Sequence, residues 1–225
     1  LIELKNSKKY QVETLNYKNI LKSNETDLKN MLSDKQWIIH CAAQTNVEDC
    51  EINQESCYKN ICHLTEKIIS CSKKTTRFIY ISSTGVYGNY QNSPYTEFDE
   101  TSPTTMHHRS KKIAEDMILK HSSKNIVIRT GWLYGNLKKN DFVSKIIKVA
   151  KKKPSKIESN TEQYGCPTNA NQLALKCIEL IQNEAYGIFN IVNSGKASRY
   201  DYVKNIIDHL NYGIEVVPVK SSFFK

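Results

Sequence analysis

Apolar and polar positions along the chain follow two spacings, one typical of buried strands and one typical of amphipathic helices. Apolar runs of strand length occur at residues 37–43 (WIIHCAA), 77–82, 125–130 and 187–192. Runs of this kind are typical of parallel strands covered on both faces. Apolar residues three or four positions apart predict helices over 25–32, 54–72, 110–120 and 171–182. A further short strand is predicted over 11–15 (QVETL).

Strand and helix alternate over most of the chain, which predicts an α/β fold with a doubly wound parallel sheet. Beyond residue 135 the pattern changes to helices over 142–150 and 200–210 and a last strand over 215–219. We therefore expect residues 1–135 to form the domain that holds the sheet. Residues 136–225 then form mainly a smaller C-terminal substrate-binding lobe, with 161–185 returning to the first domain.

Small and hydroxylated residues follow three of the predicted strands. They are the segments 42–45 (AAQT), 82–84 (SST) and 130–132 (TGW). Small residues can simply terminate strands, but ligands of doubly wound sheets bind at the carboxyl ends of the strands. Three such ends together predict a binding site at this edge.

The chain has 225 residues and a net charge of +9, and Lys supplies 28 of its 32 cationic residues. The lysine pairs and the triplet at 151–153 are scattered, and no aromatic residues are interleaved with them as in a nucleic-acid platform. We expect a solvated basic surface and no nucleic-acid partner. No apolar run approaches the roughly 18 residues that span a bilayer, so no membrane association is expected.

The seven cysteines predict neither a disulfide framework nor a metal site, because their number is odd and no C-x-x-C occurs. Cys41, Cys71 and Cys177 stand among apolar residues and are expected to be buried thiols, which favours a reducing, cytoplasmic location. The first residue is Leu1 and the segment after it is too polar for a signal peptide. This start predicts that the sequence begins partway into a longer one.

Several segments together are similar to the extended short-chain dehydrogenase/reductase superfamily, and within it to the dTDP-4-dehydrorhamnose reductase family. They are IIHCAAQTNVEDCE (38–51), FIYISSTGVYG (78–88), PYTEFDETSP (94–103), RSKKIAED (109–116), IRTGWLYG (128–135) and EQYGCPT (162–168). The resemblance implies a Rossmann-type sheet that binds NADPH or NADH. It also implies a nucleotide-linked 4-keto-6-deoxy sugar as substrate, a role in deoxysugar biosynthesis, and a homodimer as one possible assembly.

The family's catalysis implies three catalytic positions in this chain. Lys111 matches the lysine that holds the nicotinamide ribose, and Ser83 matches the hydroxyl residue that hydrogen-bonds the carbonyl. The acid, a tyrosine four residues before the lysine in the family, falls on His107. Three interpretations stay open: His107 acts as a substitute acid, activity is reduced or lost, or another group such as Tyr87 serves. We expect the adjacent His108 to be a solvated residue near the start of its helix.

The resemblance also implies a set of binding residues. Those implied for the cofactor are Asn19, Ile20, Ala42, Ala43, Thr45, Ser82 and Lys111. Those implied for the substrate are Val47, Thr84, Trp132 and Arg199. Trp132 would also fit a packing role, since large aromatics usually pack, and Arg199 suits diphosphate recognition or an ordinary surface ion pair.

The chain departs from the family at the phosphate loop, since neither G-x-x-G-x-x-G nor G-x-G-x-x-G occurs in it. Two functions follow from these matches and departures. The first is an NAD(P)H-dependent sugar-nucleotide reductase. The second is a catalytically impaired relative that binds a cofactor or a partner protein, a role that the regulatory subunit of methionine adenosyltransferase takes in this branch.

Overall fold

A parallel sheet of four strands, in the order β1-β2-β3-β8, is the centre of the larger part of the molecule. The computed structural model describes residues 9–135 and 141–224. The strands are β1 (Trp37–His40), β2 (Arg77–Ile81), β3 (Ile126–Arg129) and β8 (Gly187–Asn190). Tyr80 lies opposite His40 on one side and opposite Val127 on the other, so β2 is hydrogen-bonded on both edges.

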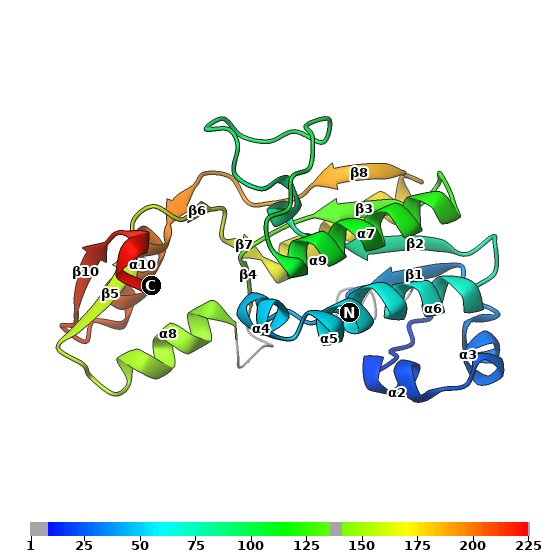
Figure 1. Cartoon of the computed structure of the whole chain (residues 1–225), viewed down its shortest axis with the longest axis horizontal. Helices are drawn as coiled ribbons and strands as arrows, with labels where there is room; N and C mark the ends of the chain where they lie inside the picture. The colour runs from blue at the N-terminus through cyan, green and yellow to red at the C-terminus, as the bar shows by residue number, and fades with distance from the viewer. Residues whose placement is uncertain (1–8, 136–140, 225) are drawn as a thin grey trace. The chain divides into compact units, whose positions relative to one another are not determined.

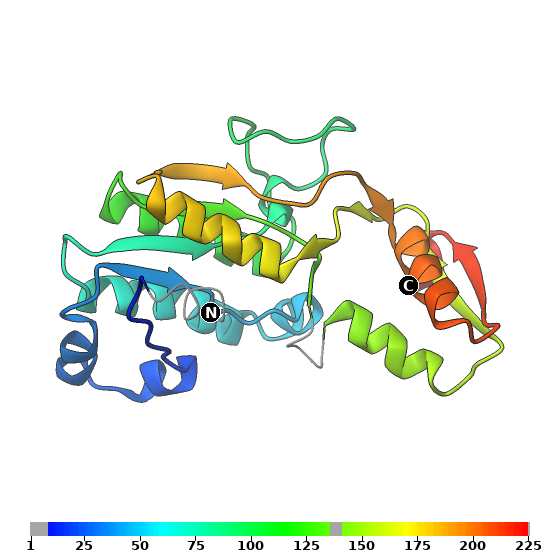
Figure 2. The ribbon, with the colours of Figure 1, turned by 180° about the vertical axis from the view of Figure 1, so that it is seen from behind.

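Helices cover both faces of this sheet (Figures 1 and 2). On one face lie α5 (Gln54–Tyr58), α6 (Leu64–Cys71) and α7 (Met106–His121), and on the other lies α9 (Ala170–Gln182). The remaining helices of this part are α2 (Tyr17–Lys22), α3 (Glu25–Leu32) and α4 (Val47–Ile52). The predicted α/β fold with a doubly wound parallel sheet is confirmed.

The chain divides into two units. Unit 1 comprises residues 1–130 and 176–191, and unit 2 comprises 131–175 and 192–225. The sequence placed the first boundary at 135, where the structure has it at 130. The sequence also predicted that residues 161–185 return to the first domain. In the structure, the later segment that belongs to unit 1 is 176–191.

Residues 11–15 are not a strand, so this prediction is wrong. The segment is irregular and makes no backbone hydrogen bond to any described residue. It lines one side of a cavity of about 660 Å³ whose other side includes β1. A strand needs a neighbour to complete its ladder, and within residues 9–135 and 141–224 none lies beside this segment. The apolar run predicted that this strand extends to Ala43, but β1 ends at His40.

The helix predicted over 54–72 forms, but it contains a π-helical turn, η1 (Lys59–His63), between α5 and α6. A π turn adds one residue and rotates the face that follows it. Ile61 and Cys62 are fully buried on this turn, and the Cys62 thiol donates to the Ser110 carbonyl of α7 at 3.4 Å. The π turn therefore brings this helix into contact with α7.

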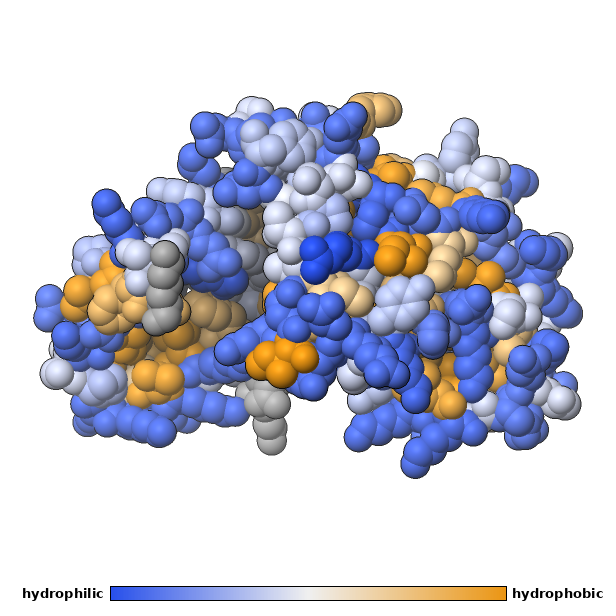
Figure 3. Space-filling view, viewed as in Figure 1, coloured by the Kyte–Doolittle hydropathy of each residue, from blue (hydrophilic) through white to orange (hydrophobic). Residues whose placement is uncertain are grey.

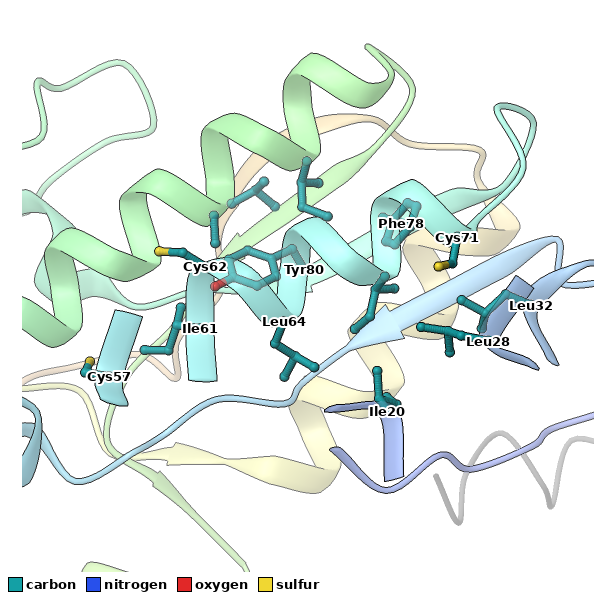
Figure 4. Packing of buried hydrophobic residues seen from close by; sticks show 14 of the residues in the cluster. Ile20, Leu28, Leu32, Cys57, Ile61, Cys62, Leu64, Cys71, Phe78 and Tyr80 are labelled. Atoms are coloured by element: carbon teal, nitrogen blue, oxygen red, sulfur yellow. The ribbon is translucent and has the colours of Figure 1, made fainter. Parts of the chain in front are cut away.

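One hydrophobic core fills the space between β2 and the helices on its α7 face (Figure 4). Phe78 and Tyr80 point from β2 into this core, and each is fully buried. Burial of one such side chain stabilises the fold by about 1.5–3 kcal/mol. The other residues of the core include Ile20, Leu28, Leu32, Cys57, Ile61, Cys62, Leu64, Cys71, Ala114 and Ile118.

Unit 2 is built from α8 (Phe142–Ala150), α10 (Arg199–Leu210) and short sheets. Its longest strands, β5 (Lys156–Asn160) and β10 (Glu215–Val219), pair in parallel. Two-residue strands form the pairs β4 (Leu133–Tyr134) with β7 (Thr168–Asn169) and β6 (Tyr164–Gly165) with β9 (Ala197–Ser198), and the turn η3 (Ser221–Phe224) follows β10. The pattern predicted both helices and β10 but missed β5, whose sequence KIESN is mostly polar.

None of the helices within residues 9–135 and 141–224 has the length and apolar character needed to cross a bilayer. Hydrophilic residues cover most of the face seen in Figure 3, with apolar groups scattered between them.

Helix α7 is tied to β3 by a buried ion pair. The guanidinium of Arg129 donates to the carboxylate of Glu115, with 2.8 Å between Nη2 and Oε2. The two side chains are only 2% and 1% exposed. A buried pair of this kind need not stabilise the fold relative to an apolar pair, but loss of one partner leaves the other as an unpaired buried charge.

We expect Glu115→Gln to lower the free energy of unfolding by about 3–5 kcal/mol, because it leaves the Arg129 charge unpaired. The matched control is Asp116→Asn in the same helix, which breaks the exposed ion pair to Lys112 and should cost less than about 1 kcal/mol. Urea denaturation followed by circular dichroism measures both. Equal losses in the two variants would contradict the role of the buried pair.

Candidate functional site

The carboxyl end of β2 places three hydroxyl side chains in a row. The Ser82 amide continues the ladder by donating to the Ile128 carbonyl at 2.7 Å, and the Thr84 amide donates to the Thr130 carbonyl at 2.9 Å. Ser83 Oγ accepts from the Gly85 amide at 3.1 Å and so caps the 3₁₀ turn η2 (Thr84–Tyr87). Ser82 is buried and its hydroxyl has no partner among the described residues, whereas Ser83 and Thr84 are half-buried.

Lys111 of α7 reaches the same strand end. Its Nζ donates to the Ile81 carbonyl at 2.7 Å and lies 4.7 Å from the centre of the Tyr80 ring. The side chain is only 5% exposed, and this burial lowers the pKa of Lys111 to about 8. The structure therefore brings Lys111 to the end of the strand that leads into Ser82 and Ser83.

Two buried polar side chains in this region, those of His40 and Thr65, were not predicted from the sequence. Nε2 of His40, the last residue of β1, lies 2.9 Å from Oγ1 of Thr65 in α6. The His40 ring also contacts Tyr80, with 5.2 Å between ring centres. Burial lowers the pKa of His40 to about 3, so the ring is neutral. No motif marks His40 or Thr65, because their contact joins residues 25 positions apart.

His107 lies on α7 one turn before Lys111 and is turned toward the chain that leaves β1. It is 7% exposed, and its Nδ1 lies 4.0 Å from the Cys50 thiol of α4. Burial, followed by the nearby His108 and Lys111, lowers the pKa of His107 to about 4, and a hydrogen bond to the Gln44 backbone opposes this shift. At pH 7 the His107 imidazole is therefore neutral.

His108 is not the solvated residue that the sequence predicted. Its Nδ1 lies 2.9 Å from the Thr105 hydroxyl, and its ring packs on Gly85, where a Cβ atom would come within 2.2 Å of the ring. Burial lowers the pKa of His108 as well. The His108 ring therefore occupies the space beside the Gly85 backbone, and a side chain at position 85 would require this ring to move.

Tyr87, the alternative proton donor, is held inside the fold. It is 1% exposed, its hydroxyl donates to Asn190 Oδ1 at 2.8 Å, and its ring stacks on Tyr95 with 4.8 Å between ring centres. A phenol with this partner and this burial does not face a ligand. Its geometry favours a structural role in joining η2 to the end of β8.

The residues implied for cofactor binding do not all come together. Ala42 and Ala43 are half-buried after β1 and pack against the core, whereas Thr45 beyond them is exposed. Ile20 of α2 is a core residue, 7% exposed, and lines the same cavity as Ala42. Asn19 is exposed on α2. Val47, implied for the substrate, is the half-buried first residue of α4.

A reduced nicotinamide dinucleotide fits these residues at one end only. The resemblance assigns the nicotinamide ribose to Lys111, whose buried ammonium lies at the end of β2. The pyrophosphate needs closely approaching backbone N–H groups, which glycines provide. The first glycine of the sequence is Gly85, so the residues around β1 contain no glycine-rich cradle.

Trp132 and Arg199, both implied for the substrate, do meet, and they meet inside unit 2. The Arg199 guanidinium carbon lies 3.6 Å from the centre of the Trp132 ring and 4.5 Å from that of Phe142. Tyr202 stacks on both aromatic rings, with centres 6.0 Å from Trp132 and 5.3 Å from Phe142. The sequence missed Phe142 and Tyr202, although the i,i+3 spacing of Arg199 and Tyr202 places them on one helix face.

The backbone at Trp132 is unusual for a large residue. Its φ is +49°, a left-handed conformation that bulky side chains rarely adopt. A Cβ atom on Gly165 would come within 2.3 Å of the Trp132 ring, so the ring packs directly on the glycine backbone. Strain of this kind persists only where the surrounding structure fixes it, and it is found most often at functional sites.

The cysteines and the metal-binding side chains add no further site. Cys71 and Cys177 are buried as expected, but Cys41 is exposed because β1 ends before it. No cluster of His, Cys, Asp and Glu within the described ranges is suited to a metal ion.

The whole chain matches a known protein family. Residues 1–225 match the profile described as "RmlD substrate binding domain". A spore coat polysaccharide biosynthesis protein, SpsK, of Bacillus subtilis is 28% identical over 76% of this chain and 60% of its own length. The dTDP-4-dehydrorhamnose reductase of Salmonella typhimurium is 28% identical over 76% of this chain and 58% of its own length. The chain spans about 60% of the length of the curated relatives it matches.

Solved structures share the fold. A dTDP-4-dehydrorhamnose reductase of Clostridium acetobutylicum superimposes with a TM-score of 0.90 at 25% identity, over 100% of this chain and 81% of that chain. The dTDP-4-dehydrorhamnose reductase of Bacillus anthracis, solved in complex with NADP, also gives a TM-score of 0.90 at 26% identity, over 97% and 79% of the two chains.

The buried neutral histidines predict a loss of stability in mild acid. The folded-state pKa values of His40 and His107 lie below the unfolded value of about 6.5, so the unfolded chain binds more protons below that pH. Stability is therefore fully present above pH 6.5 and falls as the pH decreases toward 4. Urea denaturation at several pH values measures this decline. His107→Gln should make it shallower, and the exposed His209→Gln should leave it unchanged; an unchanged decline in His107→Gln would contradict the assignment.

Proposed function

Because the chain belongs to the RmlD substrate binding domain family, we propose that it acts as an NAD(P)H-dependent reductase of a nucleotide-linked 4-keto-6-deoxy sugar in deoxysugar biosynthesis. The observation that carries this proposal is the position of Lys111, buried at the end of β2 with its Nζ on the Ile81 carbonyl. The buried free thiols of Cys71 and Cys177 support a reducing, cytoplasmic setting.

Each residue at the strand end has a defined task in this reaction. Ser83 is the hydroxyl that hydrogen-bonds the sugar carbonyl, and the oxygen gains negative charge as the carbonyl is reduced. Lys111 supplies a fixed positive charge and binds the ribose. The nicotinamide cofactor, when bound, supplies the hydride.

His107 is poorly suited to the proton transfer that the proposed reaction requires. A neutral imidazole donates a hydrogen bond but is a poor acid, and burial keeps His107 neutral at pH 7. Its contact with Cys50 also directs Nδ1 toward α4. This observation favours a second candidate function, a catalytically impaired relative that binds the cofactor or a partner protein.

We expect the protein to oxidise NADPH slowly with dTDP-4-dehydrorhamnose, and His107→Tyr to raise kcat at least about tenfold, because a positioned general acid contributes about 10²–10⁴-fold. The measurement is the decrease of NADPH absorbance at 340 nm under saturating substrate. No oxidation by the natural protein, together with no gain in His107→Tyr, would exclude the reductase and leave the impaired relative.

Two adjacent lysines on α7 provide a matched pair of variants for the same assay. Lys111→Met should abolish the remaining activity, because its buried ammonium lies at the strand end. Lys112→Met should leave activity unchanged, since Lys112 pairs with Asp116 on the outer face of the helix. Equal activity in the two variants would contradict the role of Lys111.

A further inference from the structure

The loop between η2 and α7 carries an aromatic side chain that the rest of the chain leaves uncovered. Phe98, at the tip of this loop, is 98% exposed, and the loop extends away from the sheet in both views of the ribbon (Figures 1 and 2). We propose that residues 96–100 form a docking surface for a second copy of this chain. Phe98 and the acidic residues beside it bind the lysine-rich face of α8 in that copy.

The two ends of this loop meet at its base. The Ser102 amide donates to the Tyr87 carbonyl at 3.2 Å. Gly88 has a φ of +80°, and a Cβ atom on it would come within 2.2 Å of the Ser102 carbonyl oxygen, so the backbone of the two ends is in close contact. Compact surface loops whose ends meet in this way are frequently functional.

Tyr95 fixes the middle of the loop. Its ring stacks on Tyr87 with 4.8 Å between ring centres, and its hydroxyl accepts from the Tyr90 amide at 2.9 Å and the Gln91 amide at 3.2 Å. The Tyr90 hydroxyl in turn donates to the Glu100 carbonyl at 2.7 Å. These contacts restrain the loop before a partner binds, so little conformational freedom is lost on binding.

The carboxylates on either side of Phe98 hold the turn at the tip. The Asp99 carboxylate accepts from the Thr96 amide at 2.6 Å and from the Thr96 hydroxyl at 3.1 Å, and the Asp99 amide donates to the Thr96 carbonyl at 3.2 Å. Glu97 accepts from the Asn190 amide at 2.6 Å, which ties the turn to the end of β8. Phe98 is thus an exposed aromatic side chain on a fixed backbone, and rigid aromatic anchors of this kind carry much of the binding energy of protein interfaces.

The charge around Phe98 indicates the kind of partner. Residues 97–100 read EFDE, and neither Lys nor Arg occurs from 88 to 108, whereas the whole chain has a net charge of +9. Opposite charges steer two surfaces together and set their register. The acidic tip therefore suits a basic surface, and a second copy of this chain supplies one.

Helix α8 of unit 2 presents that basic surface. Lys145, Lys148 and Val149 are exposed at the i, i+3, i+4 spacing of one helix face, and the exposed Lys152 follows in the turn after the helix. No acidic residue occurs from 142 to 157. Val149 is 43% exposed, so an apolar position lies among lysines here as Phe98 lies among carboxylates. An apolar centre with a charged rim is the usual anatomy of an interface.

Sedimentation equilibrium of the whole chain tests the role of Phe98. We expect a concentration-dependent dimer, and Phe98→Ser to raise its dissociation constant at least about tenfold, because an interface anchor is lost. The matched control is Tyr186→Ser, which removes an aromatic ring that is 68% exposed in the same unit and should leave the constant unchanged. A monomer at every concentration of the parent chain, or equal effects of the two substitutions, would overturn the proposal.

Charge reversal tests whether α8 is the surface that the loop binds. Glu100→Lys in one preparation, and Lys145→Glu with Lys152→Glu in another, should each weaken self-association, because like charges then face each other. An equal mixture of the two preparations should associate as strongly as the parent chain, since every loop in a mixed pair faces the opposite charge. The control is Lys18→Glu with Lys22→Glu on α2, which makes the same change in net charge at exposed positions.

A mixture that associates no better than its components, or a loss in the α2 control equal to that in the α8 variant, would overturn the assignment to α8. Self-association of the parent chain should also weaken in about 1 M NaCl, where charges are screened beyond roughly 3 Å. These measurements use neither cofactor nor substrate, so their outcome is independent of the proposed reductase activity.

Discussion

Helix α7 carries two charged side chains into the interior of unit 1, and the position of the site depends on how they are satisfied there. Lys111 donates to the Ile81 carbonyl at 2.7 Å and Glu115 binds Arg129 at 2.8 Å. The two residues are one helical turn apart, so they fix both the rotation of α7 and its distance from β2 and β3. His107 and His108 sit on the preceding turn and take their places from this anchoring.

The same burial sets the electrostatics of the strand end. Water is excluded around Lys111, His107 and His40, and the pKa of each falls because the charged form is disfavoured. The environment therefore suits a hydrogen-bond donor and a fixed positive charge better than a titrating acid.

Unit 2 shows a different arrangement, in which the Arg199 charge lies against aromatic rings and forms no ion pair with a described residue. Arg199 contacts the faces of Trp132 and Phe142 while the neighbouring carboxylates cap helices. Aromatic faces stabilise a guanidinium by cation–π attraction but leave its N–H edge unsatisfied.

Most of the helices and strands could be predicted from the spacing of apolar residues alone. A strand buried on both faces and a helix buried on one face each require a characteristic spacing of such residues. This spacing predicted the bounds of α3, α8 and β10 to the residue, whereas Ser83 and Lys111 were implied only by the family resemblance. It failed over 11–15, where a strand needs a neighbour that the local pattern cannot supply. Only the tertiary structure decided which way His107 and His108 face, that Gly85 admits His108, and that Phe142 and Tyr202 join Arg199. Those contacts join residues distant in sequence, and no local pattern encodes the geometry between them.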